Sequence, residues 1–271
     1  MRYNGFDWGF VDLFANERQA AIVELIRRNG AVTTGELMER FGVSIETVRR
    51  DLLVMEKKQL LQRVHGGAVA LGVIMSPKLD LAHRTGENDQ GKRELSVNAC
   101  SLISDGDIIA LDTGSTAVIM AQELRERFSS LTVVTHSLDV FNLLSNFKEF
   151  RVILCGGYFL PEENSFYGQL TLDMLSKLHV SRLFLFPSAI SLHHGICGYF
   201  EKLYQVQLKM LGCADSVCVL ADSSKFEKTA LLKIDDMSPK YTYITDSALP
   251  VELKQLYIEN DLRIITSSED I

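Results

Sequence analysis

A cluster of small polar residues, Asp112-Thr113-Gly114-Ser115-Thr116, lies between an apolar stretch and a segment with helical periodicity. The central glycine allows the main chain to approach a ligand closely, while Ser115 and Thr116 offer hydroxyls beside the free N–H groups of a helix start. Such a combination is typical of phosphate-binding loops. A plain strand-to-helix turn with a Ser/Thr cap is the alternative interpretation of this motif alone.

Three further polar stretches follow apolar runs in the same way. His136 follows the strand predicted over 131–135, Gly156 and Gly157 follow the one over 151–154, and Lys225 follows the one over 217–221. In open parallel sheets, binding groups gather at the carboxyl ends of the strands. Taken singly, His136 fits a core or surface histidine and Lys225 a solvated lysine. Their shared position favours one binding site at that edge.

The elements that must position these residues alternate between strand and helix from residue 89 onward. Apolar, β-branched runs at 107–111, 131–135, 151–154, 182–186, 217–221, 241–245 and 262–265 predict strands, and 89–103 and 117–128 predict helices. Continuous apolar strands separated by helices indicate a mainly parallel sheet with both faces covered. The larger part of the chain is therefore predicted to be α/β.

A second chemical motif lies near the amino terminus, in the run Ser44-Ile-Glu-Thr-Val-Arg-Arg-Asp-Leu52. Ser44 can cap a helix whose buried face carries Val48, Leu52 and Met55. This leaves Thr47, Arg49 and Arg50 pointing elsewhere, as in a helix that enters the major groove of DNA. A helix over 35–41 and a stop at Gly42 complete helix-turn-helix spacing. An ordinary surface helix is the alternative for the arginine pair alone.

The sequence after this helix predicts a two-stranded wing. Residues 60–70 read LLQRVHGGAVA, with Gly66 and Gly67 at or near the turn, so that Arg63 and His65 are expected near a phosphate backbone. An amphipathic helix over 17–29 and a short strand over 31–33 precede these elements. We therefore expect a winged helix-turn-helix domain over 16–70.

The two motifs together resemble the DeoR family of bacterial repressors. The pattern S-x-x-T-V-R-R-D-L followed by R-V-H-G-G-A is similar to the DNA-binding domain of that family. The T-G-S-T loop is similar to its C-terminal sensor domain, which looks like ribose-5-phosphate isomerase. The chain departs from the family at Gln59, where glycine is usual, at His136, where asparagine is usual, and at Pro187-Ser188-Ala189, where glycine is usual and related isomerases carry acidic residues.

The resemblance implies a phosphorylated sugar as effector. Its phosphate would lie on Gly114, Ser115 and Thr116, Lys225 would neutralise its charge, and Asp112 and His136 would hydrogen-bond the sugar hydroxyls. Thr113, Gly156 and Gly157 complete the expected site. The isomerase reaction needs a carboxylate base, and the lack of acidic residues after the strand at 182–186 argues against catalysis.

Composition is consistent with a two-domain protein of the cytoplasm. The chain has 271 residues and a net charge of −7, and we count +1 for residues 1–70. No apolar run approaches the ~20 residues needed to span a bilayer. The five cysteines lack metal-ligand spacing and are expected to be reduced core thiols. We predict an extension over 1–15, a linker over 71–88 and a sensor domain over 89–271.

The predicted function is that of a sequence-specific transcriptional regulator, in most cases a repressor, that binds double-stranded operator DNA and a phosphosugar. No cofactor or metal is expected, and one short recognition helix predicts a homo-oligomer because it reads few base pairs. Two alternatives remain open. One is an isomerase-like enzyme with an accessory DNA-binding domain, and the other is a constitutive DNA-binding protein whose sensor has lost its ligand.

Overall fold

A computed structural model describes residues 15–29, 31–58, 60–64, 67–70, 81, 84 and 88–270. The chain divides into two units, Met1–Ser76 and Pro77–Ile271. Of the predicted extension over 1–15, only Ala15 is described. Of the predicted linker over 71–88, only Leu81, Arg84 and Asn88 are described, and His65 and Gly66 of the wing also lie outside the described residues.

The first unit packs three helices against a small antiparallel sheet. Its elements are α1 (Ala15–Asn29), β1 (Ala31–Thr33), α2 (Thr34–Phe41), α3 (Ile45–Lys57), β2 (Leu61–Val64) and β3 (Gly67–Ala70), and the sheet order is β1-β3-β2. As predicted, Val48, Leu52 and Met55 are buried, where they meet Ile22 and Ile26 of α1. Gly42 ends α2 with a φ of 62°, a left-handed conformation that favours glycine.

A buried ion pair joins two helices of this unit. Arg18 of α1 donates from Nε to Oδ2 of Asp51 in α3 over 2.6 Å, and Gln19 donates to the other carboxylate oxygen over 3.1 Å. Because Asp51 is buried, these bonds compensate the loss of water around its charge.

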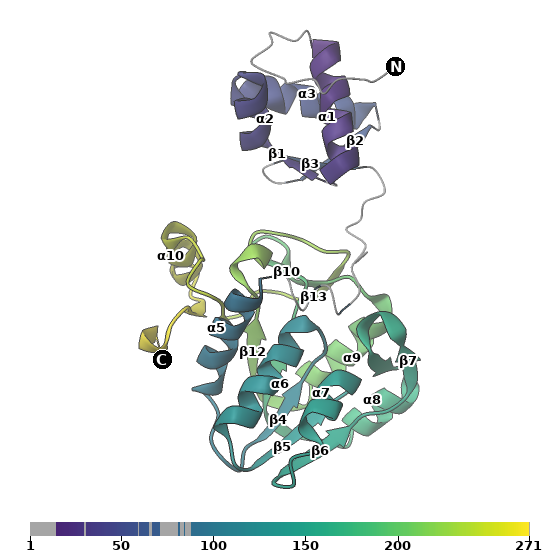
Figure 1. Cartoon of the computed structure of the whole chain (residues 1–271), viewed down its shortest axis with the longest axis vertical. Helices are drawn as coiled ribbons and strands as arrows, with labels where there is room; N and C mark the ends of the chain where they lie inside the picture. Colours follow the sequence, from purple (N-terminus) through teal and green to yellow (C-terminus); the bar gives the residue numbers. More distant parts are fainter. Residues whose placement is uncertain are drawn as a thin grey trace, which may run out of the picture. The chain divides into compact units, whose positions relative to one another are not determined.

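The second unit is built on a seven-stranded, wholly parallel sheet in the order β15-β14-β12-β9-β4-β5-β6 (Figure 1). The strands are β4 (Ile108–Leu111), β5 (Leu131–Thr135), β6 (Phe150–Leu154), β9 (Val180–Leu185), β12 (Ala214–Leu220), β14 (Tyr241–Ile244) and β15 (Arg263–Ile265). The prediction of a parallel α/β sheet is confirmed.

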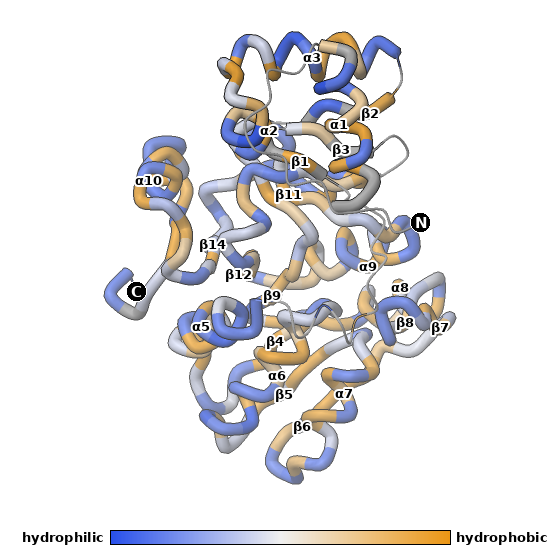
Figure 2. The backbone as a smooth tube through the Cα atoms, turned by 45° about the horizontal axis from the view of Figure 1, so that its top comes forward, coloured by the Kyte–Doolittle hydropathy of each residue, from blue (hydrophilic) through white to orange (hydrophobic). Residues whose placement is uncertain are grey.

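Helices cover both faces of the sheet and create two cores. Helices α5 (Asp89–Cys100), α6 (Ser115–Arg127) and α7 (Leu138–Leu144) lie on one face, and α8 (Gln169–Leu175), α9 (Glu201–Leu211) and α10 (Val251–Glu259) lie on the other. Ile109 and Leu111 of β4 enter the first core while Ala110 enters the second, as strand alternation requires. Figure 2 accordingly shows β4 and β5 as hydrophobic stretches, whereas α3 of the first unit alternates between hydrophobic and hydrophilic residues.

Two smaller sheets were not predicted. A hairpin joins β7 (Tyr158–Leu160), through the 3-10 turn η1 (Pro161–Glu163), to β8 (Ser165–Tyr167). A three-stranded sheet consists of β10 (Ala189–Ser191), β11 (Gly195–Gly198) and β13 (Leu232–Asp235). The 3-10 turns η2 (Ser223–Lys225) and η3 (Ser268–Asp270) complete the unit. The five cysteines are free and buried, and no helix in the described part of the chain is long and apolar enough to cross a bilayer.

Candidate functional site

The predicted DNA-reading residues lie on α3 and the wing of the first unit. Ser44 caps α3, because its Oγ accepts from the N–H of Thr47 over 3.3 Å. Arg49 and Arg50 are exposed on the side of α3 away from the buried Val48. Arg49 lies 3.7 Å from Glu46 Oε1, in a pair that is open to solvent. Both guanidinium groups are therefore accessible to a phosphate or a base edge.

Arg63 of the wing is tied to α3. Its main-chain N–H donates to Glu56 Oε1 over 2.9 Å, and its guanidinium lies 4.0 Å from Glu56 Oε2. These contacts fix strand β2 against the C-terminal half of α3. Arg63 is therefore held in a fixed position relative to Arg49 and Arg50 of the same helix. His65 lies outside the described residues.

In the second unit, the loop 112–116 follows β4 at the place where the order of the sheet changes direction. From β4 the chain proceeds to β5 and β6 on one side, and then returns to β9 on the other side of β4. Asp112 N–H donates to Phe184 of β9 over 3.1 Å, which closes the loop against that strand. Ligands of open α/β sheets bind outside the carboxyl ends of the strands at such a switch point.

The geometry of the loop suits an anion. Gly114 has a φ of 123° and a ψ of 172°, a conformation that is essentially restricted to glycine. The first intrahelical bond of α6 runs from Val118 N–H to Gly114 over 3.2 Å. The N–H groups of Ser115, Thr116 and Ala117 thus lie in the first turn, where a helix leaves its donors without intrahelical partners.

Asp112 and His136 are brought together, but away from the surface. His136 Nε2 lies 2.9 Å from Asp112 Oδ1, Gln207 of α9 donates to Asp112 Oδ2 over 3.0 Å, and His136 Nδ1 lies 2.9 Å from the main-chain oxygen of Phe166. Asp112 and His136 are both 0% exposed. Contact of these two side chains with a sugar stays a prediction. In the structure they bond protein groups and hold the base of the loop.

Thr113 connects the loop to a residue that sequence reasoning missed. Its Oγ1 donates to the main-chain oxygen of Glu163 over 3.1 Å, and Glu163 itself is buried with its carboxylate bonded to Arg84 Nη2. Burial raises the pKa of Glu163 to about 7, although the nearby Arg84 charge lowers it. Lys92 of α5 donates to the main-chain oxygen of Arg84. Local sequence patterns carry no signal for a pair 79 positions apart.

The two predicted glycines after β6 differ in their surroundings. A Cβ on Gly157 would lie 2.3 Å from Thr171 Oγ1 and 2.5 Å from the main-chain oxygen of Tyr167, so this glycine permits close packing. A Cβ on Gly156 would meet no atom within 4 Å. The main-chain oxygen of Gly156 accepts a hydrogen bond from Thr171 Oγ1 over 3.1 Å. Their contact with a ligand stays a prediction.

Lys225 ends η2, directly after β12. The turn is held by Asp222, whose main-chain oxygen accepts from Lys225 N–H over 2.8 Å and whose carboxylate accepts from Ser224 N–H over 3.1 Å. A second cation, Lys228, was missed by the sequence analysis. Desolvation and then the charge of Lys225 lower the pKa of Lys228, while Asp222 raises it. The sequence did contain a signal for it, because Lys225 and Lys228 stand three positions apart after a predicted strand. Two mutually repelling cations favour a bound anion.

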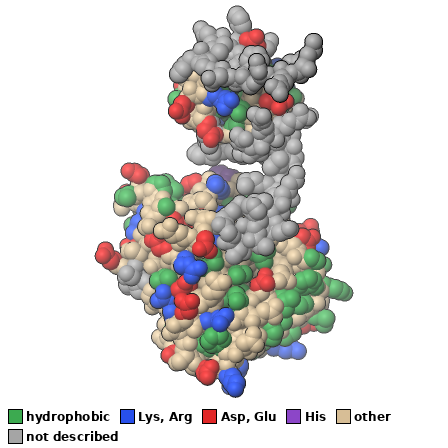
Figure 3. Space-filling view, viewed as in Figure 1, with side chains coloured by type: hydrophobic (Ala, Val, Ile, Leu, Met, Phe, Trp, Pro, Cys, Tyr) green, Lys and Arg blue, Asp and Glu red, His purple; other side chains and the backbone are tan. Residues whose placement is uncertain are grey.

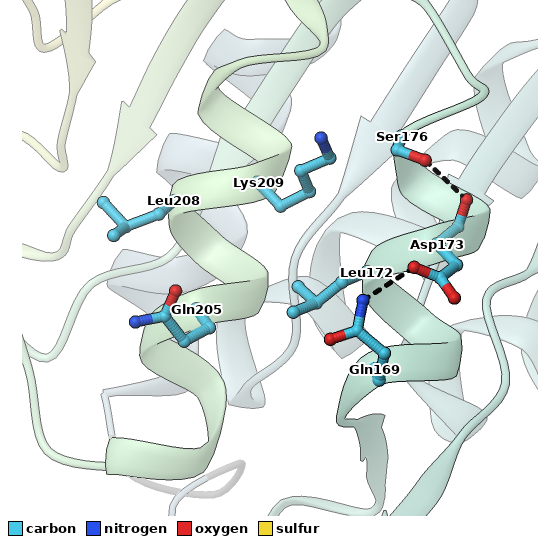
Figure 4. Close-up of a pocket in the computed structure, with 7 residues that line it drawn as sticks. All are labelled: Gln169, Leu172, Asp173, Ser176, Gln205, Leu208 and Lys209. Atoms are coloured by element: carbon cyan, nitrogen blue, oxygen red, sulfur yellow. Dashed lines mark hydrogen bonds between the residues drawn. The ribbon is translucent and has the colours of Figure 1, made fainter.

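A groove between α8 and α9 is a separate feature (Figure 4). It is lined by Gln169, Leu172, Asp173, Ser176, Gln205, Leu208 and Lys209. Gln169 donates to Asp173 over 2.7 Å, so the polar groups of α8 partly satisfy each other. None of these residues belongs to the loop at the switch point.

Comparisons with known proteins cover both units. A family model described as the DeoR-like helix-turn-helix domain matches residues 18–72, and one described as the DeoR C terminal sensor domain matches residues 87–247. The L-fucose operon activator of Haemophilus influenzae is 30% identical over 255 residues, which are 92% of this chain and 99% of that protein. The glycerol-3-phosphate regulon repressor of Escherichia coli K12 is 28% identical over 249 residues, which are 92% of this chain and 97% of that protein.

One solved structure is a partial match to this chain. Ribose 5-phosphate isomerase A from Neisseria gonorrhoeae matches with a TM-score of 0.38 and 14% identity, over 50% of this chain and 52% of that chain.

Proposed function

The chain belongs to the DeoR family of transcriptional regulators, and on that premise we propose that it represses sugar-metabolism genes under the control of a phosphorylated sugar. The observation that carries the effector class is the loop 112–116, with Gly114 in a glycine-only conformation at the switch point of a parallel sheet. The name of the glycerol-3-phosphate regulon repressor agrees with a phosphorylated metabolite. We place the protein in the cytoplasm, where such metabolites and DNA are both present.

We propose α3 as the recognition helix. Arg49 and Arg50 lie near its capped amino end, exposed, while Val48 and Leu52 hold its other side in the core. A helix with this polarity places its first turns against base edges in the major groove. Ser44 and Thr47, which bond each other at 3.1 Å, lie at the same end and suit phosphate contacts. Two chains on a two-fold operator are proposed, since one such helix reads few base pairs.

The DNA-binding part is tested by Arg49→Ala and Arg50→Ala on operator DNA taken from the upstream region of the gene. Loss of a phosphate contact lowers the slope of log affinity against log salt concentration by about one unit. Loss of a base contact instead weakens specific binding by ~1–3 kcal/mol and relaxes the sequence preference at one base pair. Fluorescence anisotropy across salt concentrations separates the two roles. Arg151→Ala, an exposed arginine of the sensor unit, is the control. Wild-type binding by both helix variants would remove α3 as the reader.

The effector part is tested by a thermal-shift screen of the full chain against phosphosugars, repeated with operator DNA. A ligand at a hundred times its dissociation constant stabilises the folded state by ~2.7 kcal/mol. The matching unphosphorylated sugars should give no shift. If no phosphosugar shifts the melting temperature, the alternative of a constitutive DNA-binding protein is favoured.

Glu163 is the observation that favours an isomerase as second candidate. Its pKa, raised by burial to about 7, suits a general base. However, its carboxylate is bonded to Arg84 and is 2% exposed, so it has no open path to a substrate carbon. We therefore propose regulation rather than catalysis. Turnover of a pentose phosphate by the wild type, abolished in Glu163→Gln, would favour catalysis over regulation.

A further inference from the structure

Glu227 has a main-chain conformation that is unusual for its residue type. It lies between Lys225 and Lys228 in residues 222–228, which we name the lysine turn, and its φ is 51°. Among the described residues, the other non-glycine positions with a positive φ are all asparagine or aspartate, whose short side chains tolerate this region. A glutamate lacks that tolerance, so contacts around it must hold the conformation.

The side chain of Glu227 makes such contacts itself. Its Oε1 accepts a hydrogen bond from the hydroxyl of Tyr257 over 2.6 Å and another from the main-chain N–H of Leu192 over 3.2 Å. Tyr257 is buried in α10, and Leu192 follows β10. Burial and the hydrogen bond to Glu227 raise the pKa of Tyr257, so its hydroxyl keeps the proton that it donates. One carboxylate oxygen thus joins three segments that are far apart in the sequence.

The residues on either side of Glu227 are also fixed. Phe226 is buried, its ring centroid lies 5.3 Å from that of Tyr257, and its main chain forms a parallel bridge with Ile190. The main-chain N–H of Lys228 donates to the oxygen of Ile190 over 3.3 Å. The lysine turn is therefore held in one conformation at the carboxyl end of β12.

The left-handed conformation of Glu227 brings the two lysines together. Phe226 is extended, with a φ of −71° and a ψ of 147°, and in a continuous extended chain residues three positions apart point to opposite faces. The change of direction at Glu227 interrupts this alternation. Desolvation and then the charge of Lys225 lower the pKa of Lys228, while Asp222 raises it, as expected for two ammonium groups that face a common space.

A local pair of cations is needed because the chain as a whole repels anions. Its net charge is −7. On the face drawn in Figure 3, the basic side chains of the second unit are scattered among acidic ones. An anionic ligand therefore gains its attraction from cations close to it, since more distant charges are screened by salt. Two ammonium groups that repel each other are stabilised when they share an anion.

We propose that Glu227 is a positioning residue of the effector site, which holds Lys225 and Lys228 side by side so that both act on one anionic group of the ligand. The proposal rests on the proposed function only for the class of that ligand, a phosphorylated sugar. Through its bonds to Tyr257 and Leu192, Glu227 sets the turn before the ligand arrives. A turn that is already ordered loses little conformational entropy on binding.

Three substitutions separate the hydrogen bonds of Glu227 from its backbone conformation. Glu227→Gly allows the left-handed conformation without strain but removes both bonds, so damage to the fold through strain is avoided. Glu227→Gln retains both bonds, because they end on a single oxygen that the amide also has. Tyr257→Phe removes one donor and leaves the buried ring in place.

Two matched controls make the same changes elsewhere. Asp261→Gly relieves another positive φ, of 60°, at an exposed turn between α10 and β15. Tyr243→Phe alters a second buried tyrosine, whose hydroxyl bonds the main chain of Ser238 instead of the lysine turn. Neither control should affect the two lysines.

The first measurement needs no ligand. The pH dependence of acetylation by acetic anhydride, followed by mass spectrometry of peptides, gives the pKa of Lys228, with the exposed Lys240 as internal reference. The wild-type value should lie below 10.5. Glu227→Gly, Tyr257→Phe and Lys225→Met should each raise it. Loss of a carboxylate by itself would lower the pKa of a nearby lysine, so a rise in Glu227→Gly reports that the two lysines have separated.

The second measurement uses inorganic phosphate as the probe, titrated into each full-length protein by calorimetry. Loss of one contact to a charged group weakens binding roughly 10-fold or more. We expect that loss in Glu227→Gly and a change in the same direction in Tyr257→Phe. Glu227→Gln and both controls should bind phosphate as the wild type does.

The outcomes distinguish the placement of the lysines from the class of ligand. An unchanged pKa of Lys228 in Glu227→Gly, or equal phosphate affinity of this variant and the wild type, overturns the proposal. So does a Glu227→Gln protein that behaves like Glu227→Gly, because the hydrogen bonds would then not be the cause. If the wild type binds no phosphate while the pKa of Lys228 responds as expected, the proposed effector class fails and the placement of the lysines by Glu227 stands.

Discussion

Arg84 donates from Nη2 to Oε1 of the buried Glu163, 79 positions along the chain. Arg84 lies between β3, the last strand of the DNA-binding unit, and α5, the first long helix of the sensor unit. The main-chain oxygen of Glu163 accepts a hydrogen bond from Thr113 of the loop 112–116. One residue thus contacts both the loop and the stretch that leads to the DNA-binding unit. Through Glu163, Arg84 is therefore linked to the loop 112–116.

The pH dependence of stability should reveal the charge state of Glu163. Burial raises the pKa of Glu163 from 4.5 to about 7 in the folded protein. A raised carboxyl pKa contributes stability that is fully present below about pH 4.5 and is lost as the pH rises through about 7. The wild type should therefore lose up to ~3 kcal/mol relative to Glu163→Gln between pH 5 and pH 8. Urea unfolding of both proteins at each pH measures this difference. If the free energies of unfolding of the two proteins change in parallel with pH, the pKa of Glu163 is not raised.

Removal of Arg84 should uncouple the two units. We expect Arg84→Met to bind a phosphosugar within a few-fold of wild type, because the loop itself is intact. The effect of that ligand on DNA affinity, normally ~1–3 kcal/mol, should fall below ~1 kcal/mol. Anisotropy titrations with and without ligand give both values. Arg93→Met removes a guanidinium from α5 that pairs with Glu123 at 3.0 Å, and this control should retain the response. If the ligand changes DNA affinity equally in the two variants, Arg84 does not connect ligand binding to DNA binding.

Lys225, which follows β12 at the carboxyl edge of the sheet, should contribute directly to phosphate binding. A hydrogen bond to a charged group is worth ~1.5–3 kcal/mol, so Lys225→Ala should weaken phosphosugar binding roughly 10–150-fold and leave operator affinity unchanged. Lys240→Ala is the matched control, since Lys240 is exposed and precedes β14 at the opposite, amino edge of the sheet. Calorimetric titration of each protein compares the dissociation constants. A normal Lys225→Ala titration would remove this lysine from the site.

Much of this architecture was predictable because its signals are local. The periodicity of the apolar residues predicts the parallel strands, and the cap at Ser44 and the stop at Gly42 predict the helix-turn-helix. The ends of parallel strands then bring Asp112, His136 and Lys225 to one edge of the sheet. The same reasoning did not predict that Asp112 and His136 are buried away from the surface.

The contacts around the loop could not be predicted in this way. Glu163 comes from a short hairpin whose three-residue strands carry little periodic signal. Arg84 reaches it from a segment 79 positions away in the sequence. Asp112, which bonds His136, also accepts a hydrogen bond from Gln207 of a distant helix. Such long-range polar contacts arise from tertiary packing and leave no pattern in neighbouring residues.

The buried ion pair of the DNA-binding unit should be important for its stability. Removing one partner of a buried pair typically costs ~3–5 kcal/mol, because the other charge is left without compensation. We expect Asp51→Ala to destabilise this unit by that amount and to abolish operator binding near physiological temperature. Glu46→Ala removes the exposed partner of Arg49 and should change stability by less than ~0.5 kcal/mol. Circular dichroism melts of both variants measure the effect. A loss below 1 kcal/mol in Asp51→Ala would show that the pair is dispensable.

Gly114 and Gly156 allow the effect of backbone strain to be separated from the effect of side-chain crowding. A Cβ meets no atom within 4 Å at either Gly114 or Gly156, but only Gly114 has a positive φ, at 123°. Gly114→Ala should therefore cost roughly 1–3 kcal/mol through backbone strain alone, and should relax by distorting the loop. We expect it to lose phosphosugar binding while operator binding persists.

The same substitution at Gly156 is the control. Gly156→Ala has neither strain nor a steric conflict and should stay within ~0.5 kcal/mol of wild type in urea unfolding. Its phosphosugar affinity reports whether the end of β6 contacts the ligand at all. If Gly114→Ala binds phosphosugars as the wild type does, the loop conformation is irrelevant to the effector, and the phosphate must bind elsewhere on the sheet edge.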